Sequence, residues 1–598
     1  MCGIHVCVST RSFKSPSDDL QQLLCSRGPD HTGESHVEIR IKDGHSYWIS
    51  AFSTVLALRG DHTTAQPFID PSSGSILCWN GEAWRIGSES IQGNDGQALF
   101  ELLMGASSAQ KSNTESTVAI LRILHAVSGP FAFVFVDKIH NQIYFGRDRL
   151  GRRSLLYEIS SDSTSLHISS VADPHSGSWQ EVDADAIYEV SFEADPGLKS
   201  RDENDGLLSL SFASICRHLW EDHSAEGVVF PLGRFNRAHP SQGQTLNRQT
   251  ESVQLLRRYL CESLKLRILN VPLPPGSADG HGVRVAVLFS GGLDCTVLAR
   301  MAHDILPADQ QIDLINVAFE NPRVVKAAKN SAKVLDDGNE VGVGGAGHSA
   351  PAVTDGSLTG DSPFESCPDR GTGRKAYQEL QTICPDRCWR FVAVNVPYKE
   401  TVAHRNNVIN LIRPHNTEMD LSIGYALYFA ARGRGFASTN AQMTPVAYST
   451  PARVLLSGLG ADELFGGYTR HATAWSRRGF TGLLDELKLD IDRLGKRNLG
   501  RDDRVISHWG REARFPYLDE NFVKWAVECP IWGKCGFQSS VLAEPEIPDL
   551  EPGKKVLRLL AYELGMHSVA QEKKRAIQFG ARTAKMEVGS TKGTALIS

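Results

Sequence analysis

The chain has 598 residues, which is too long for one ordinary hydrophobic core and predicts several domains. Hydrophobic residues make up 41% and charged residues 22%, as in soluble globular proteins, and the net charge of −6 gives no bulk attraction for nucleic acid. No apolar stretch approaches the ~20 residues of a membrane helix, and the N-terminus lacks the apolar core of a secretion signal. We therefore expect a cytoplasmic protein with reduced cysteines and with neither a nucleic-acid nor a membrane partner.

Residues 1–205 are predicted to be mainly strands. Segments such as "SILCWNGEAW" and "GPFAFVFVDKIHNQIYFGRDRLG" are rich in β-branched and aromatic residues and are separated by Gly, Asn or Asp. Residues 206–250 are polar and irregular, and we expect a linker there.

From residue 251 onward the hydrophobic pattern changes to that of an α/β protein. "SVQLLRRYLCESLKLRIL" has helical spacing, whereas "VRVAVLF", "IDLINVAF", "RFVAVNV" and "RVLLSG" are apolar runs typical of parallel strands buried on both faces. Strands that alternate with helices indicate an open parallel sheet, and the last third is predicted to be mostly helical. Residues 335–373 are rich in Gly, Ser and Asp without periodicity, so we expect a flexible surface insertion.

The chain begins "MCGIHVCV", which places Cys2 directly after the initiator methionine. If Met1 is removed, Cys2 carries a thiol and a free α-amine, which titrates near about pH 8 and can act as the base for its own side chain. Taken alone, this short pattern favours an ordinary cysteine over a nucleophile. The rest of the chain has to decide between the two.

"VRVAVLFSGGLDCTVLARMA" predicts a strand, a glycine turn and a helix. Gly291 and Gly292 let the backbone approach an anion closely, and the helix start near Cys295 offers free N–H groups. Ser290 adds a hydroxyl donor, and Asp294 is of the type that holds Mg²⁺ beside phosphate oxygens. The loop follows a strand, where open α/β sheets bind ligands. A plain glycine turn is the alternative.

This loop resembles the PP-loop of the ATP pyrophosphatases, S-G-G-x-D-[ST], with Cys295 in place of the final hydroxyl residue. Together with the N-terminus it resembles the glutamine-dependent asparagine synthetases, in which a class II, Ntn-type glutaminase domain precedes a synthetase domain. Further matches follow in order: "SRGPD", "AQPF", "NGE", "NDGQ" and "RDRLGRRSLLY", then "LLSGLGADELFGGYTRH" and "RDDRVISHWGREARFPYLD". So many ordered matches favour a nucleophile at Cys2.

The resemblance implies an α+β N-terminal domain of the Ntn-type αββα sandwich over 1–205. It implies an α/β PP-loop domain (adenine nucleotide alpha hydrolase-like) with a helical C-terminal part over 251–598. The activity implied is that of a ligase of asparagine biosynthesis, with glutamine hydrolysis at Cys2 and acyl-adenylate formation at the PP-loop. Ammonia then gives the amide, AMP and pyrophosphate. ATP and Mg²⁺ are the implied cofactors, glutamine and aspartate or another carboxylate are the implied substrates, and a homodimer is left open.

The resemblance also assigns site residues. For glutamine hydrolysis, the nucleophile is Cys2 and the oxyanion hole is formed by Asn80 and Gly81. The residues assigned to glutamine binding are Arg59, Asn80, Gly81, Glu82 and Asp95. Those assigned to ATP are Leu288, Ser290, Gly291, Gly292, Asp294, Cys295, Val317, Ser457, Gly458, Asp462 and Lys574. The implied metal ligands are Asp294 and Asp462.

Three positions depart from the family pattern. Val55 stands where an Arg would bind the glutamine carboxylate, and Arg59 is either its substitute or a surface charge. Leu459 replaces a Glu expected near the adenylated carboxylate, and Ala576 replaces a Lys expected at phosphate, with Lys574 just upstream. Two interpretations remain: an active amidotransferase, or a synthetase-like protein with weakened or altered chemistry. The second could be a scaffold, a pseudoenzyme or a ligase for another acceptor.

Overall fold

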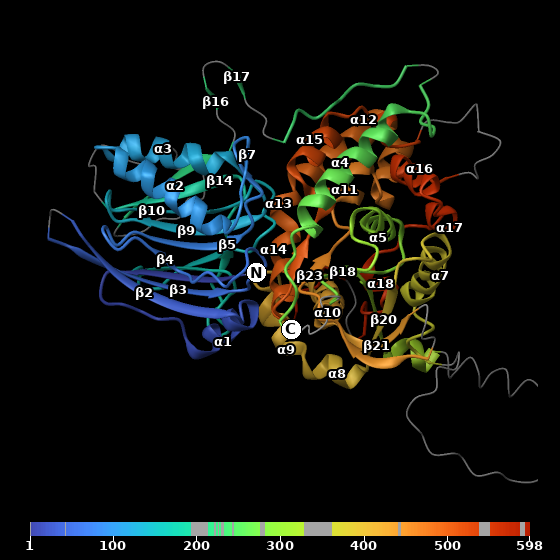
Figure 1. Cartoon of the computed structure of the whole chain (residues 1–598), viewed down its shortest axis with the longest axis horizontal. Coiled ribbons are helices and arrows are strands. Elements are labelled where there is room, and N and C mark those ends of the chain that lie inside the picture. Colours follow the sequence, from blue (N-terminus) through green and yellow to red (C-terminus); the bar gives the residue numbers. More distant parts are fainter. Residues whose placement is uncertain are drawn as a thin grey trace, which may run out of the picture.

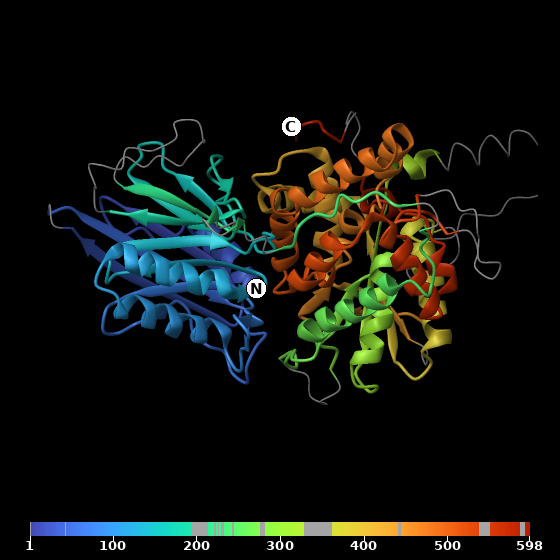
Figure 2. The same ribbon diagram turned by 90° about the horizontal axis from the view of Figure 1, so that it is seen from above.

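The computed structural model describes residues 2–41, 44–192, 213–220, 223–224, 227–228, 232–241, 244–275, 282–327, 362–439, 444–537, 550–586 and 593–597. These residues form two bodies side by side, one from the first part of the chain (blue to cyan in Figure 1) and one from the later part (green to red). Figure 2 shows the same two bodies from above, meeting along one seam. The start of the chain lies at this seam in both views.

The N-terminal body contains two six-stranded antiparallel sheets packed face to face. The first has the order β13–β11–β12–β1–β3–β2 and consists of β1 (Gly3–Ser9), β2 (His31–Arg40), β3 (Ser46–Val55), β11 (Leu156–Ile159), β12 (Ser165–Ser169) and β13 (Gln180–Glu181). The second has the order β15–β14–β10–β9–β5–β4 and consists of β4 (Phe68–Ile69), β5 (Ile76–Gly81), β9 (Phe131–Asp137), β10 (Gln142–Arg147), β14 (Ala186–Ser191) and β15 (Ser214–Leu219).

Helices cover the outer faces of the two sheets. Alternate residues of β1 (Ile4, Val6 and Val8) enter the core between the sheets, as the period of a strand requires. Helices α2 (Asp95–Ala109) and α3 (Asn113–Ala126) pack on the second sheet, and α1 (Asp18–Arg27) packs on the first. The short strands β6 (Arg85–Ile86), β7 (Glu89–Ser90) and β8 (Val127–Ser128) form a third sheet in this body, and β16 (His223–Ser224) and β17 (Gly227–Val228) form a separate pair.

The second sheet extends beyond residue 205, where we expected the N-terminal domain to end. β15 (Ser214–Leu219) pairs antiparallel with β14 inside the range 206–250 that we expected to be a linker. Its side chains are half-buried or exposed, so the strand is held through its main chain and its sequence carries little hydrophobic signal. Farther along the expected linker, Asn236 donates its N–H to the Val527 carbonyl of the second body at 3.0 Å.

The second body is built on a seven-stranded sheet with the order β22–β21–β20–β19–β18–β23–β24. Five neighbouring strands are parallel, as the alternating pattern predicts: β18 (Val285–Leu288), β19 (Ile312–Phe319), β20 (Trp389–Val396), β23 (Val454–Leu456) and β24 (Glu512–Arg514). Two antiparallel strands close one edge: β21 (Arg434–Thr439) and β22 (Val446–Ser449).

Helices surround this sheet and make up most of the last third of the chain. They are α4 (Glu251–Ile268), α5 (Leu293–Ile305), α7 (Pro368–Ile383), α8 (Tyr398–Ala403), α9 (Arg405–Ile412), α10 (Glu418–Arg432), α11 (Ala461–Phe465), α12 (Thr469–Asp492), α13 (Leu494–Arg497), α14 (Leu499–Ser507), α15 (Glu520–Glu528), α16 (Lys555–Glu563), α17 (His567–Ala570) and α18 (Ile577–Gly580). Two 3₁₀ turns span Pro516–Leu518 and Ile531–Gly533.

The expected insertion at 335–373 is wrong at its C-terminal end, because α7 already begins at Pro368. A proline at the first helical position and Asp369 in the first turn favour a helix start there. Arg370 is buried and donates to the Asn316 side chain on β19 at 2.7 Å, which fixes this helix to the sheet. Residues 335–361 of the expected insertion lie outside the described residues.

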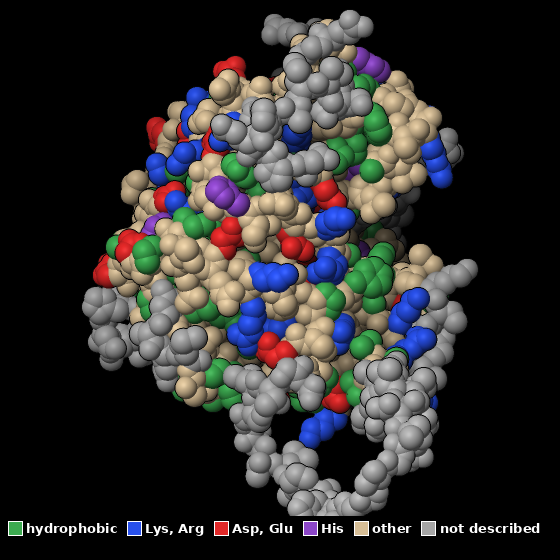
Figure 3. Space-filling model, turned by 90° about the vertical axis from the view of Figure 1, so that its right-hand side faces the viewer, with side chains coloured by type: hydrophobic (Ala, Val, Ile, Leu, Met, Phe, Trp, Pro, Cys, Tyr) green, Lys and Arg blue, Asp and Glu red, His purple; other side chains and the backbone are tan. Residues whose placement is uncertain are grey.

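Within the described ranges, no helix combines the length and the apolar character that a membrane crossing needs. On the end face of the molecule seen in Figure 3, basic and acidic side chains are interspersed with hydrophobic ones. All 12 cysteines are free thiols.

Candidate active sites in the two bodies

Cys2 lies just before β1, in a cavity at the seam. Its side chain is only 8% exposed. Gln66 Nε2 lies 3.7 Å from Cys2 Sγ, and Gln66 Oε1 accepts the Trp79 N–H at 2.9 Å. Burial raises the pKa of the Cys2 thiol, so a nearby base is needed to form the thiolate at neutral pH. Sequence reasoning noted the "AQPF" segment but did not assign Gln66 to the site.

Asn80 and Gly81, the predicted oxyanion hole, end strand β5, and of the two only Gly81 is among the residues that line this cavity. Asn80 is fully buried, and within the described residues neither atom of its side-chain amide has a hydrogen-bond partner. A Cβ on Gly81 would lie 2.3 Å from the Pro130 carbonyl oxygen, so only glycine fits there. An unpaired buried amide costs about 1–3 kcal/mol, which a bound polar ligand can offset. The Asn80 amide is therefore a buried, unpaired group in the described residues, next to the cavity-lining Gly81 in the chain.

Asp95 and Arg59 also line the cavity, as predicted, and both have protein partners. Asp95 Oδ2 accepts the Ala83 N–H at 2.7 Å and the Trp79 Nε1–H at 3.1 Å. Burial raises the pKa of Asp95, and the charge of Arg59 opposes that rise. The Arg59 guanidinium donates to the carbonyls of Ala83 (2.8 Å) and Ile91 (2.7 Å). Arg59 is thus a fixed residue of the cavity wall and not a surface charge.

Glu82 pairs with a residue of the second body. Its carboxylate is 4% exposed and accepts a hydrogen bond from Arg514 of β24. Arg514 Nε also donates to Glu512 at 2.6 Å, and Arg153 lies 3.0 Å from the other oxygen of Glu512. Burial raises the pKa of Glu82, and the guanidinium of Arg514 opposes that rise. Glu512 itself lines the Cys2 cavity, so the second body completes the wall of this site.

The seam contains several more ion pairs between the two bodies. Arg27 donates to Asp503 at 2.9 Å and to the Cys2 carbonyl at 3.4 Å. Other pairs that cross the seam are Arg152–Glu520 at 2.5 Å, Arg453–Asp30 at 2.6 Å and Arg504–Glu181 at 2.7 Å. Arginine–carboxylate contacts therefore join the two bodies, together with the apolar contacts of Leu56, Leu58 and Leu150 with the core of the second body.

The seam is expected to weaken in acid. Burial alone would raise the pKa values of Glu512 and Glu520, but the nearby arginines hold both at about 2. Both values lie below the about 4.3 of an unfolded Glu, so this stabilisation is complete above about pH 4.3 and is lost as the pH falls toward 2. Calorimetry should give a midpoint of thermal unfolding that falls below about pH 4.3. Equal midpoints at about pH 3 and about pH 6 would contradict this.

The second site lies where β18 and β23 meet in the sheet. The chain runs from β18 to one side through β19 and β20 and returns to β18's other side through β23 and β24. Open α/β sheets bind ligands at such a switch point, outside the carboxyl ends of the strands. The loop after β18 leads into α5, with Gly292 as the N-cap, and the loop after β23 leads into α11.

The two loops touch each other. A Cβ on Gly458 would lie 2.9 Å from the Cβ of Asp294, and a Cβ on Gly291 would lie 2.5 Å from the backbone of Gly373. Gly291 has φ +79°, a conformation that other residues adopt only with strain. Close approach of neighbouring atoms thus requires glycine at Gly291 and Gly458, whereas a Cβ on Gly292 would meet only Ser290 Oγ at 3.3 Å.

Cys295, Leu288 and Val317 lie around the loop as predicted. Cys295 Sγ lies 3.6 Å from Ser290 Oγ and 3.4 Å from the Gly292 carbonyl, so the thiol is bonded within the loop. Leu288 ends β18 opposite Ile315, and Val317 lies two residues farther along β19. Both aliphatic side chains therefore belong to the carboxyl edge of the sheet.

A cluster of charges joins the two loops, and Lys554 is at its centre. Its Nζ lies 2.8 and 2.9 Å from the two carboxylate oxygens of Asp294 and 2.9 Å from Asp462. Lys574 Nζ donates to the other oxygen of Asp462. Burial would raise the pKa of Asp462, but the two lysines hold it far below its usual range. Asp294, Asp462 and Lys574, all predicted site residues, thus meet at one place.

Sequence reasoning missed Lys554. It lies in "EPGKKVLRLL", where the preceding Pro-Gly is the only local signal. Its side chain is 2% exposed and its backbone has φ +56°, which costs about 1–3 kcal/mol for a residue that is not glycine. Strain of this kind is common at functional sites.

Each of the two bodies contains a region that matches a known protein family. The family model of the glutamine amidotransferase domain matches residues 1–195, and that of asparagine synthase matches residues 443–485 and 481–593. Asparagine synthetase domain-containing protein 1 of Bos taurus is 34% identical over 651 aligned residues, which cover 99% of this chain and 97% of the relative. The chain belongs to the asparagine synthetase domain-containing protein 1 family. The members from Homo sapiens (33% identical) and Gallus gallus (32% identical) match 98% and 99% of this chain and 96% and 98% of their own length.

Membership in the asparagine synthetase domain-containing protein 1 family confirms the predicted resemblance and the glutamine amidotransferase domain at the N-terminus. The asparagine synthase match includes Ser457, Gly458, Asp462, Lys554 and Lys574. The loop Ser290–Asp294 lies outside both matched ranges, so its place in the site rests on the geometry described above.

Two of the three departures from the asparagine synthetase pattern, Leu459 and Ala576, lie at this second site, whereas Val55 lines the Cys2 cavity. Leu459 is half-buried and packs against the main core, and its N–H donates to Ser457 Oγ at 3.4 Å. Ala576 is the N-cap of α18, while Lys574 provides the cation beside Asp462. Burial and the charge of Asp462 raise the pKa of the neighbouring Glu463, which accepts the Tyr468 hydroxyl at 2.5 Å.

Proposed function

We propose that this chain is an ATP-dependent amidotransferase of the asparagine synthetase type, acting in the cytoplasm. Glutamine is hydrolysed at Cys2, and the ammonia amidates a carboxylate that is activated at the loop after β18. The observation that carries the proposal is the meeting of Asp294 and Asp462 at Lys554, because it joins two loops of the switch point through charges suited to a nucleotide triphosphate. The free thiols fit a reducing compartment.

At the first site the chemistry follows from three residues. With Met1 removed, the α-amine of Cys2 takes the thiol proton, and Sγ attacks the side-chain amide carbon of glutamine. Asn80 Nδ2–H and the Gly81 N–H donate to the oxyanion, and each such donor is worth ~3 kcal/mol. The amine then gives its proton to the leaving ammonia, and water hydrolyses the thioester to glutamate. Asp95 and Arg59 line the cavity with opposite charges, as the two ends of a free amino acid require.

The second site fits ATP and Mg²⁺ by the chemistry of its residues. Asp294 and Asp462 are the carboxylates that would hold Mg²⁺, which offsets the triphosphate charge when bound. Ser290 and the N–H groups at the start of α5 offer donors to phosphate, and Lys554 and Lys574 supply cations. The acceptor carboxylate displaces pyrophosphate from ATP to give an acyl-adenylate, and ammonia then displaces AMP with release of one proton.

A direct assay tests the proposal. The full chain is incubated with glutamine, aspartate, ATP and Mg²⁺, and glutamate, pyrophosphate and asparagine are quantified. We expect equal amounts of asparagine and pyrophosphate, with ammonium chloride able to replace glutamine. Absence of both glutamate and pyrophosphate would contradict the proposal.

A ligase for another carboxylate acceptor is the second candidate, and Leu459 favours it. An apolar side chain at this position cannot accept a proton or bind a polar acceptor as a Glu would. The same assay separates the two candidates, because a ligase for another acceptor releases pyrophosphate with other carboxylates and not with aspartate. A protein that binds ATP without releasing pyrophosphate with any acceptor would instead be a scaffold.

Gly291→Ala is expected to weaken ATP binding at least about tenfold. The added Cβ would lie 2.5 Å from the Gly373 backbone, and the alanine backbone would have to adopt φ +79°. Gly371→Ala is the matched control, because a Cβ there meets no atom within 4 Å. Titration calorimetry with ATP and Mg²⁺ measures both variants. Equal affinities would show that the loop does not contact the nucleotide.

A further inference from the structure

The turn that ends β5 is held in place by Arg514, a residue of the second body. Arg514 bonds the Glu82 carboxylate, the Glu512 carboxylate at 2.6 Å and the Arg267 carbonyl at 2.5 Å, and it is 3% exposed. These contacts occupy all three guanidinium nitrogens with fixed acceptors. Glu82 directly follows Asn80 and Gly81, so the position of the proposed oxyanion hole depends on this arginine.

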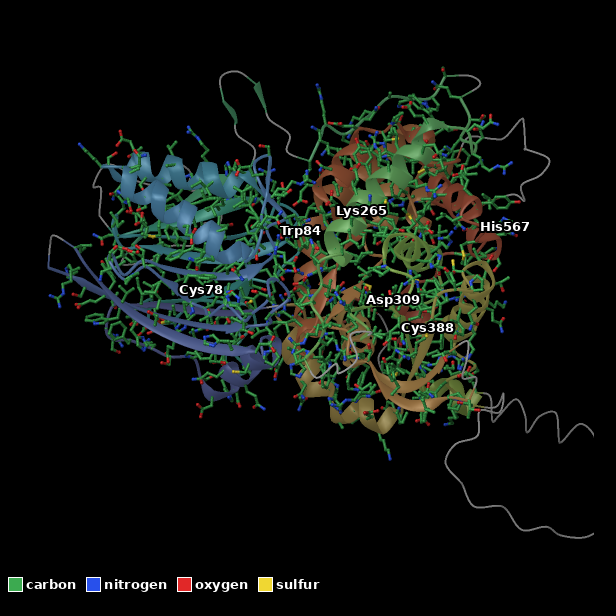
Figure 4. The ribbon with its side chains drawn as sticks, in the orientation of Figure 1. Cys78, Trp84, Lys265, Asp309, Cys388 and His567 are labelled. Atoms are coloured by element: carbon green, nitrogen blue, oxygen red, sulfur yellow. The ribbon has the colours of Figure 1, made fainter. Side chains whose placement is uncertain are left out.

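A second contact strengthens the same attachment. The Trp84 side chain lies at the seam of the two bodies (Figure 4) and is 6% exposed. The guanidinium groups of Arg59, Arg267 and Arg514 lie 5.9, 5.6 and 5.4 Å from its ring. Cations placed over an aromatic ring are attracted by its quadrupole, most strongly where water is excluded. Arg514 therefore holds the segment after the turn at two points, Glu82 and Trp84.

The main chain of Arg514 reaches the other site. Its carbonyl accepts the Ser457 N–H at 2.9 Å, and β24 pairs with β23 so that Arg514 lies opposite Leu456. Ser457 and Gly458 begin the loop that touches Asp294. One residue thus contacts the glutamine turn with its side chain and the nucleotide loop with its backbone.

We propose that Arg514 is a positioning residue for glutamine hydrolysis that makes the Asn80–Gly81 turn respond to nucleotide at the Ser457–Gly458 loop. The proposal rests on the proposed function. A shift of the loop on nucleotide binding moves β24 through the Ser457 bond, and Arg514 transmits that movement to Glu82. Because one oxygen of Glu82 is bound by Arg514, Glu82 holds the turn as well as lining the cavity.

Arg514→Lys is the variant that tests this. Lysine keeps the charge but cannot reach Glu82, Glu512 and the Arg267 carbonyl together in the geometry of a guanidinium. Arg504→Lys is the matched control, because Arg504 is also buried and crosses the seam to Glu181 but touches neither site. We expect the kcat of glutamine hydrolysis to fall at least about tenfold in Arg514→Lys with KM changed less than about threefold, and stimulation by ATP to disappear. Arg504→Lys should lower the midpoint of thermal unfolding, but its kcat for glutamine hydrolysis and its stimulation by ATP should be those of the wild type.

A second measurement does not need turnover. The rate at which iodoacetamide alkylates Cys2, followed by mass spectrometry of the N-terminal peptide, should change at least about twofold on adding ATP and Mg²⁺ to the wild type and to Arg504→Lys. It should not change in Arg514→Lys. If the wild type releases no glutamate, the proposed function fails, and the alkylation rates still decide the role of Arg514. The inference would be overturned if ATP and Mg²⁺ did not change the Cys2 alkylation rate of the wild type. It would also be overturned if they changed the rates of the two variants equally.

Discussion

Replacing Cys2 with alanine is expected to lower glutamate release at least about 10³-fold while amide formation from ammonium chloride continues. The variant lacks the only sulfur among the described residues that line the cavity with Gln66 and Gly81, so no thioester can form there. The second site lies in the other body and keeps all its residues. Product analysis with glutamine and with ammonium chloride, run in parallel, measures the two activities separately.

Cys25→Ala is the control for the Cys2 variant. Cys25 is half-buried on α1, and its thiol lies 3.7 Å from the Thr32 hydroxyl, away from the cavity. It should behave as wild type with both ammonia sources. The prediction would be refuted if Cys2→Ala still released glutamate, or if it lost the ammonia-dependent reaction as well.

Lys554→Met should abolish pyrophosphate release and also destabilise the protein. Without the ammonium group, Asp294 loses its ionic partner in the cluster and faces Asp462 across the two loops. Breaking a buried ion pair by removing one partner typically costs about 3–5 kcal/mol. Added Mg²⁺ should restore part of the lost stability, because it can neutralise the same carboxylates. Thermal unfolding with and without Mg²⁺ and a pyrophosphate assay measure the two effects.

Lys555→Met is the matched control for this variant. Lys555 is the next residue, is half-buried and lies against Gly536 rather than against the acidic pair. We expect it to retain pyrophosphate release and to show no Mg²⁺-dependent gain in stability. Indistinguishable behaviour of the two methionine variants would mean that Lys554 has no role in the site.

The sequence was sufficient to predict the family resemblance and the two bodies, and the structure brings many of the predicted site residues together, because their signals are local. Alternation along β1 and unbroken apolar runs such as β18 follow directly from strand burial. The motifs with Cys2, Asn80 and Asp294 are short and lie at strand ends, where chemistry-bearing residues gather in α/β folds.

The parts that could not be predicted depend on contacts between residues far apart in the chain. Lys554 reaches Asp294 across 260 positions, and Arg514 reaches Glu82 across 432. Neither lysine nor arginine has a periodic pattern that reveals its partner, since both side chains are usually solvated. β15 was not predicted for a different reason, because an edge strand with half-exposed side chains has a weak hydrophobic pattern.

The abundance of arginine–carboxylate pairs between the two bodies also bears on how this protein can be handled. If the two bodies were separated, these charged groups would be ionised and hydrated, but Leu56, Leu58 and Leu150, which pack in the core of the second body, would be exposed as well. Two polypeptides produced from separate genes would then recognise each other partly through these ion pairs. Their reassembly rate should fall as ionic strength rises, which offers a route to a split, salt-tunable version.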